Sequence, residues 1–179
     1  MLQISSTYNI AEVFFNEPTK PHYLIEISKK VGLAHTSTKN YLITLKKEGV
    51  INEDIEKKGK RFFPSYTAEI NNSAYKNYKK ISNLIKINNS GLIDDLRDKL
   101  MPKSIILFGS YSKGEDIETS DIDIFVEAKK QEIDISKYEK EFKRKIELHF
   151  NESFNNYPKE LRNNIINGII LYGYLEACK

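Results

Sequence analysis

The sequence predicts an α+β protein made of two parts joined by a long helix. Its 179 residues suffice for one large domain or two small ones. Helical periodicity dominates the first half, whereas apolar runs typical of strands alternate with helical segments in the second. The polar sequence Asn-Asn-Ser-Gly at 88–91 separates the halves. We therefore expect domains at 1–68 and 90–179, with a linker helix at 69–89.

The composition is that of a folded protein, with 40% hydrophobic and 30% charged residues. No apolar run approaches the roughly 20 residues of a membrane span, and the N-terminus lacks a signal pattern. The single cysteine, Cys178, cannot form an intrachain disulfide or a cysteine-based zinc site. We therefore expect a soluble, cytoplasmic protein.

The net charge of +3 is unevenly divided between the halves. Residues 1–88 carry a net charge of +6, and residues 89–179 carry −3. This difference favours a polyanion-binding module beside a module with another task. Two ordinary solvated surfaces are the alternative interpretation.

Turn signals divide the first half into short elements. Helices are expected at 8–16, 22–31 and 36–48, each ended by a proline or glycine. Residues 50–55 and 61–66 flank a basic, glycine-containing turn, which predicts a hairpin. The linker helix carries a narrow apolar seam that would form a homodimer contact or pack on the chain's own domains. The seam residues are Ile70, Ala74, Tyr78, Ile81 and Ile85.

Three helices and a basic hairpin resemble the winged helix-turn-helix fold, with residues 31–51 similar to its run from the turn into the wing. If Thr38, Leu42 and Leu45 face the core, the opposite face carries side chains suited to a DNA major groove. These side chains are Ser37, Asn40, Tyr41 and Thr44. The wing would contact the DNA phosphates through Lys57, Lys58, Lys60 and Arg61. A protein-interaction role is the alternative, and DNA binding would favour a dimer.

The second half predicts alternating helices and strands. Helices are expected at 92–100, 136–145 and 158–172, and strands at 104–108, 121–127 and 146–150. The first strand is followed at once by Gly109-Ser110, where a phosphate can approach the backbone closely.

Acidic residues follow at strand spacing. Asp121 and Asp123 are expected on one face of their strand, because side chains alternate along it. Neighbouring carboxylates repel each other unless a cation lies between them, which predicts a Mg²⁺ site. Glu147 would complete a three-carboxylate cluster if its strand lies beside this one. His149 shares the face of Glu147 and would touch the site or be a partly exposed structural residue.

This pattern resembles the DNA polymerase β-like nucleotidyltransferase superfamily, specifically its minimal nucleotidyltransferase branch. The similarity spans about 90–175 and rests on Gly109, Ser110, Asp121 and Asp123, with Gly114 and Ser120 at commonly matched positions. Glu147 fits the later acid by strand context, although the family more often has Asp there. Residues 168–173 (GIILYG) are similar to the family's closing helix. The chain departs from the family in having Tyr111 and only Lys113 where basic residues usually follow Gly-Ser.

The resemblance implies a Mg²⁺- or Mn²⁺-dependent transfer of a nucleoside monophosphate from an NTP to an acceptor. Asp121, Asp123 and Glu147 would hold the metals and act in catalysis, and Gly109, Ser110, Lys113 and Ser120 would bind the nucleotide. The implied acceptor is a macromolecule, such as a partner toxin modified by an antitoxin or the 3′ end of tRNA, with small molecules such as aminoglycosides as a further family option. The alternative function is a DNA-binding regulator whose second domain senses a nucleotide or a partner without catalysis.

Overall fold

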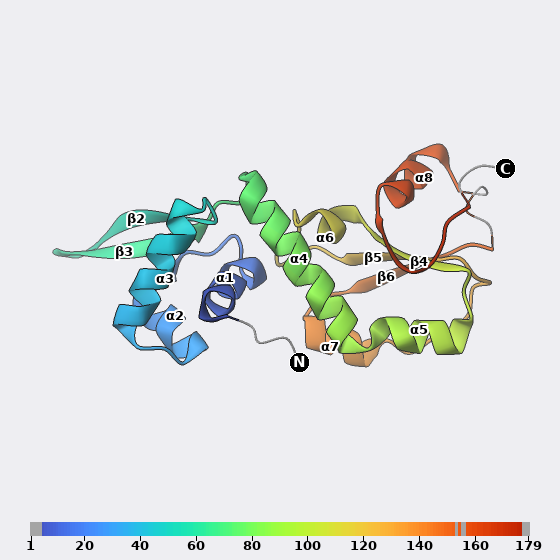
Figure 1. Cartoon of the computed structure of the whole chain (residues 1–179), viewed down its shortest axis with the longest axis horizontal. Coiled ribbons are helices and arrows are strands. Elements are labelled where there is room, and N and C mark those ends of the chain that lie inside the picture. Colours follow the sequence, from blue (N-terminus) through green and yellow to red (C-terminus); the bar gives the residue numbers. More distant parts are fainter. Residues whose placement is uncertain (1–4, 153, 155–156, 177–179) are drawn as a thin grey trace. The chain divides into compact units, whose positions relative to one another are not determined.

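The protein, described here as a computed structural model, contains two compact units. They comprise residues 1–82 and 83–179, and the division falls within the long helix α4 (Ser73–Ser90) (Figure 1). The structure describes residues 5–152, 154 and 157–176, so Cys178 lies outside it. Helices and strands occur in both units, which confirms the α+β class. Among the described helices, none has the length and apolar character needed to cross a membrane.

The described part of the first unit combines α1, α2, α3 and the start of α4 with a three-stranded antiparallel sheet in the order β1-β3-β2. In chain order its elements are α1 (Ser6–Asn16), β1 (His22–Tyr23), α2 (Leu24–Val31), α3 (His35–Lys47), β2 (Ile51–Lys58) and β3 (Arg61–Ala68). The predicted stripe of α3 is buried, because Thr38, Leu42 and Leu45 are each at most 3% exposed. Gly32 ends α2 at φ +66°, a conformation that favours glycine.

The second unit contains a four-stranded mixed sheet in the order β6-β5-β4-β7. Its elements after α4 are α5 (Leu92–Leu100), β4 (Ser104–Phe108), α6 (Gly109–Lys113), β5 (Ile122–Val126), α7 (Ser136–Phe142), β6 (Ile146–Phe150), α8 (Lys159–Ile166) and β7 (Ile169–Gly173). β5 and β6 are parallel, and the other pairs are antiparallel. All five residues of β4 are buried, so the sheet has a core on both faces.

The end of the chain differs from the sequence prediction. A single helix was expected over 158–172, but α8 ends at Ile166 and the apolar run forms β7, which pairs with β4. Ile169 and Ile170 favour extended backbone, and Gly168 bonds back to the Ile165 carbonyl in the turn between the two elements. The similarity of 168–173 to a closing helix is therefore wrong. The helix expected at 136–145 is also shorter, because Lys143 adopts φ +54° after α7.

Candidate active site

The candidate site lies where β4, β5 and β6 run side by side. Asp123 pairs with Phe108 on β4 and with Glu147 on β6, so the expected adjacency of the two acid-bearing strands is found. Ile122 and Ile124 are fully buried, while the Asp123 side chain is 26% exposed. Strand alternation thus sends the isoleucines into the core and the carboxylate to the accessible face.

Asp123, Glu147 and His149 form one cluster. A donor atom from each lies within 4.8 Å of a donor atom from the other two. His149 Nε2 is 3.3 Å from Asp123 Oδ1 and 3.9 Å from Glu147 Oε2. The imidazole also packs edge-on against Phe108, with ring centroids 5.0 Å apart. The strand pleat and this ring contact together direct His149 toward both acids.

Lys145 supplies a positive charge at the edge of the cluster. Its Nζ donates to Glu147 Oε1 at 2.6 Å. This bond raises the pKa of Lys145, and the charge of Asp121 raises it further. Asp121 precedes β5 and does not belong to the three-residue cluster. Both oxygens of Glu147 face charged or titratable neighbours, Oε1 toward Lys145 and Oε2 toward His149.

Gly109 allows the backbone to approach Asp123. Its φ is +73°, which favours glycine, and an added Cβ would overlap Asp123 Oδ2 and lie 3.2 Å from its Cγ. This contact follows from the pairing of Phe108 with Asp123, because Gly109 is the next residue along the chain. Ser110 follows in α6 and is half-buried. The glycine is thus required by both its backbone conformation and the carboxylate beside it.

A buried ion pair holds the loop that leads to Asp121. Arg144 Nη2 lies 2.9 Å from Asp116 Oδ2, and the two side chains are 9% and 1% exposed. Asn83 donates to Asp116 Oδ1 at 2.8 Å and to the Tyr111 carbonyl at 2.9 Å. Arg144 also donates to the carbonyls of Ile117 and Ser120. Arg144 therefore links the segment before β5 to the segment before β6.

The remaining predicted nucleotide-binding residues lie around this loop. Lys113 is exposed at the end of α6. The Ser120 hydroxyl accepts a hydrogen bond from the Ile117 amide at 3.0 Å and so closes a turn. Neither residue's predicted role in binding a nucleotide is tested by these contacts, and both stay predictions.

The predicted DNA-binding residues lie in the first unit. On α3, Asn40 and Thr44 are exposed, whereas Ser37 and Tyr41 are half-buried and Tyr41 packs against the core. Lys57 and Lys60 are exposed near the hairpin turn, while the side chains of Lys58 and Arg61 lie outside the described part of the structure. DNA binding by these residues stays a prediction. The proposed dimer seam is similarly untested, although Ile70, Tyr78 and Ile81 are exposed.

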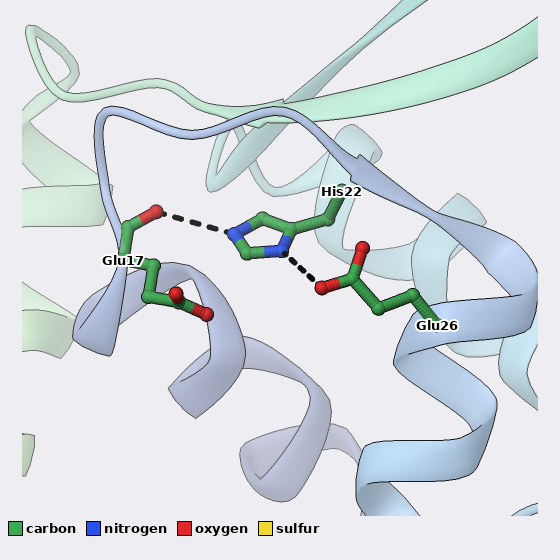
Figure 2. Close-up of side chains that lie close together, drawn as sticks. All are labelled: Glu17, His22 and Glu26. Atoms are coloured by element: carbon green, nitrogen blue, oxygen red, sulfur yellow. Dashed lines mark hydrogen bonds and ion pairs between the residues drawn. The ribbon is translucent and has the colours of Figure 1, made fainter.

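A second acid and histidine cluster occurs in the first unit. His22 is 1% exposed, and its ring lies between Glu17 and Glu26 (Figure 2). Nε2 is 3.2 Å from the Glu17 carbonyl, and Nδ1 is 3.8 Å from Glu26 Oε1. However, the Glu17 carboxylate already accepts from Lys20 at 2.6 Å and Lys30 at 2.5 Å. Since these ammonium groups neutralise the carboxylate, the cluster is an ion-pair network.

A known protein family matches most of the second unit in sequence. Residues 90–172 match the model of the nucleotidyltransferase domain family. This match supports nucleotidyl transfer as the general chemistry of residues 90–172. Two relatives from Methanocaldococcus jannaschii are named "Putative protein adenylyltransferase MJ1379" and "Putative protein adenylyltransferase MJ1215". They are 66% and 58% identical over 32 and 33 residues, 18% of this chain in each case.

These relatives are matched over only part of their length. The matched segments span 32% and 38% of the two proteins, about a third of each. A solved structure titled "Possible transcriptional regulator from Methanosarcina mazei Go1" is 14% identical and aligns with 54% of this chain and 79% of its own, with a TM-score of 0.38. A TM-score this low supports no conclusion about the fold or the function of this chain.

Sequence reasoning missed the parts of the site that depend on non-local contacts. Nothing near Asp116 or Arg144 in the chain marks them as partners, because 28 positions separate them. For Lys145, the sequence offers only its position two residues before Glu147, which does not indicate a place in the site. His149 did give a signal, its alternation with Glu147, and the structure places its ring beside both acids.

Proposed function

We propose that the nucleotidyltransferase domain transfers a nucleoside monophosphate from an NTP to a hydroxyl group of a macromolecule, with release of pyrophosphate. The family match supports the general chemistry. The names of the two M. jannaschii relatives favour an adenylyl group and a protein acceptor among the possible substrates. A partner toxin is one such protein, and the 3′ end of tRNA is the competing acceptor.

The observation that carries this proposal is the meeting of Asp123 and Glu147 on adjacent strands beside Gly109. Two accessible carboxylates with donor atoms within 4.8 Å of each other fit a divalent cation, which prefers oxygen ligands. Mg²⁺ or Mn²⁺ bound there would neutralise charge on the triphosphate and on the departing pyrophosphate. Asp121, which precedes β5, is proposed as a further ligand.

The chain's own residues would hold the nucleotide and the acceptor hydroxyl in position for the transfer. Gly109 and Ser110 present backbone amides without a bulky side chain, as a cradle for phosphate oxygens requires. Glu147 would accept the proton of the attacking hydroxyl, or hold that hydroxyl in place. Holding the reactants in line and stabilising developing charge are the main catalytic effects in such a transfer, so no covalent intermediate is needed.

The position of the label tests the reaction type. The purified chain is incubated with a cell extract and with each NTP labelled either at the α-phosphate or at the γ-phosphate. Nucleotidyl transfer predicts a macromolecule labelled from the α-phosphate only. Protease and ribonuclease treatment then identify the acceptor as protein or RNA. A macromolecule that is labelled from the γ-phosphate only when the chain is added would contradict the proposal. So would the absence of any α-phosphate label that depends on the added chain.

We further propose that the first unit is a winged helix-turn-helix module that binds DNA. The three helices, the β1-β3-β2 sheet and the exposed lysines near its hairpin turn support this assignment. A regulator without catalysis is the competing function of the whole chain. Operator binding that responds to nucleotide, together with no pyrophosphate release, would favour the regulator.

DNA binding is tested through its dependence on salt. Replacing Lys57 and Lys60 by Ala should weaken binding and reduce the slope of log affinity against log salt by about 0.9 for each phosphate that the variant no longer neutralises. Lys129 and Lys130, exposed in the other unit, provide a matched double replacement that should change neither quantity. An unchanged slope in the Lys57/Lys60 variant would show that the hairpin does not contact the phosphates.

A further inference from the structure

We propose that His149 is itself a ligand of the catalytic cation, so that the site combines nitrogen with oxygen donors and prefers a first-row transition ion such as Mn²⁺ over Mg²⁺. This inference rests on the proposed function, because it assigns a ligand within that site. The three-carboxylate cluster expected from the sequence contains no nitrogen donor. In the structure, the cluster of three donor groups contains Asp123, Glu147 and His149.

The distances fit a shared ion. Two ligands bound to one ion at about 2.1 Å lie about 3.0 to 3.5 Å apart at octahedral or tetrahedral angles. His149 Nε2 is 3.3 Å from Asp123 Oδ1, within this range, and 3.9 Å from Glu147 Oε2, slightly outside it. A small rotation of the Glu147 side chain, which is 38% exposed, would bring its oxygen into range.

The surroundings of His149 favour ligation. The contact with the Phe108 ring fixes the plane of the imidazole, and the ring remains 27% exposed, so an ion can reach it. Lys145 occupies Oε1 of Glu147, which leaves Oε2 directed toward His149. The lysine therefore takes one side of the carboxylate and leaves the other for the ion.

The donor set determines which ion binds best. Mg²⁺ prefers oxygen ligands in nearly ideal octahedral geometry and retains its waters. A neutral imidazole nitrogen is a better donor to first-row transition ions than to Mg²⁺. Replacing one oxygen ligand by His149 should therefore shift the relative affinity toward Mn²⁺.

A purely structural role for His149 makes a different prediction. If the histidine only donates a hydrogen bond that orients Asp123, its nitrogen is not bonded to the ion. Electron spin echo envelope modulation of bound Mn²⁺ separates the two roles, because it detects a directly coordinated ¹⁴N nucleus. The measurement requires no turnover.

The experiment uses the full chain with Mn²⁺ as the probe. We expect ¹⁴N modulation in the wild type and its replacement by the ¹⁵N pattern after labelling with ¹⁵N-histidine, a result that depends on no variant. His149→Gln should abolish the ¹⁴N modulation and weaken Mn²⁺ binding at least about tenfold. The Mg²⁺ affinity, measured by competition, should change less than about threefold. His35→Gln, an exposed histidine in the first unit, is the matched control and should leave all three readings unchanged.

The possible failures are distinguishable. Mn²⁺ bound without nitrogen modulation, or equal losses of Mn²⁺ and Mg²⁺ affinity in His149→Gln, would overturn the ligand assignment and leave the carboxylate site and its nucleotidyl transfer intact. Absence of bound Mn²⁺ and Mg²⁺ in the wild type, together with no α-label transfer, would overturn the proposed function as well.

Discussion

Replacement of Gly109 by Ala tests how closely the backbone and the Asp123 carboxylate are fitted together. Gly109 has φ +73°, and an alanine in the left-handed region costs about 1 to 2 kcal/mol. The added Cβ would also overlap Asp123 Oδ2. Because this oxygen is at the end of a side chain that can rotate, we expect the overlap to displace the carboxylate rather than to unfold the domain.

The expected result is thus a small loss of stability with a large loss of function. Gly109→Ala should lower the free energy of unfolding by about 1 to 2 kcal/mol, measured by chemical denaturation. Label transfer from the α-phosphate should fall at least about a hundredfold, since misplacement of a reacting group by about 1 Å has effects of that order. Mn²⁺ affinity should fall in parallel.

Gly91 provides a matched control in the same unit. Its φ is +77°, but no atom lies within 4 Å of an added Cβ. Gly91→Ala should therefore show the same loss of stability as Gly109→Ala and normal label transfer. In a double-mutant cycle, Asp123→Ala should remove any stability cost specific to Gly109→Ala. If Gly109→Ala transfers label at the wild-type rate, the close contact is not a feature of the working site.

Two further predictions concern charged contacts. Hydrogen bonds from Lys20 and Lys30 lower the pKa of Glu17 from 4.5 to about 2, so the stability they provide is complete above about pH 4.5 and is lost as the pH falls toward 2. Since the carboxylate is 29% exposed, Glu17→Gln should lower the free energy of unfolding by only about 1 kcal/mol at pH 7. The variant should also show a flatter pH dependence of the free energy of unfolding between pH 5 and 2. A pH profile identical to that of the wild type would refute this prediction. Arg144→Met removes the guanidinium group 2.9 Å from the buried Asp116 carboxylate and should lower the free energy of unfolding by about 3 kcal/mol in chemical denaturation, with Arg144→Lys intermediate. A loss below about 1 kcal/mol would show that the ion pair does not hold the loop.

The parts of the second unit that could be predicted from sequence have local causes. The buried run at 104–108 and the alternation around Asp123 predicted β4 and β5, because strand periodicity is visible within five residues. β7 was not predicted, because a short apolar run fits a helix or a strand equally well and its pairing with β4 decides between them. α7 ends early at Phe142, because Lys143 adopts a left-handed conformation that its residue type does not signal.

The same distinction applies to the candidate site. Asp123 and Glu147 were selected from strand context, and the parallel register of β5 and β6 brings them together. The position of Asp121 outside the three-residue cluster could not be predicted, since it depends on where β5 begins. The Arg144–Asp116 pair depends on packing between distant segments, which no local pattern in the chain encodes.

The most direct test of the central claim is pyrophosphate release by the purified chain with NTP, a divalent cation and the identified acceptor. Asp123→Asn and Glu147→Gln, which remove the two carboxylate charges and keep the side-chain shapes, should each abolish release while the free energy of unfolding stays within about 1 kcal/mol of the wild type. Asp54→Asn, an exposed acid in the first unit, should release pyrophosphate at the wild-type rate. Wild-type release by either cluster variant would contradict the assignment of these acids to the reaction.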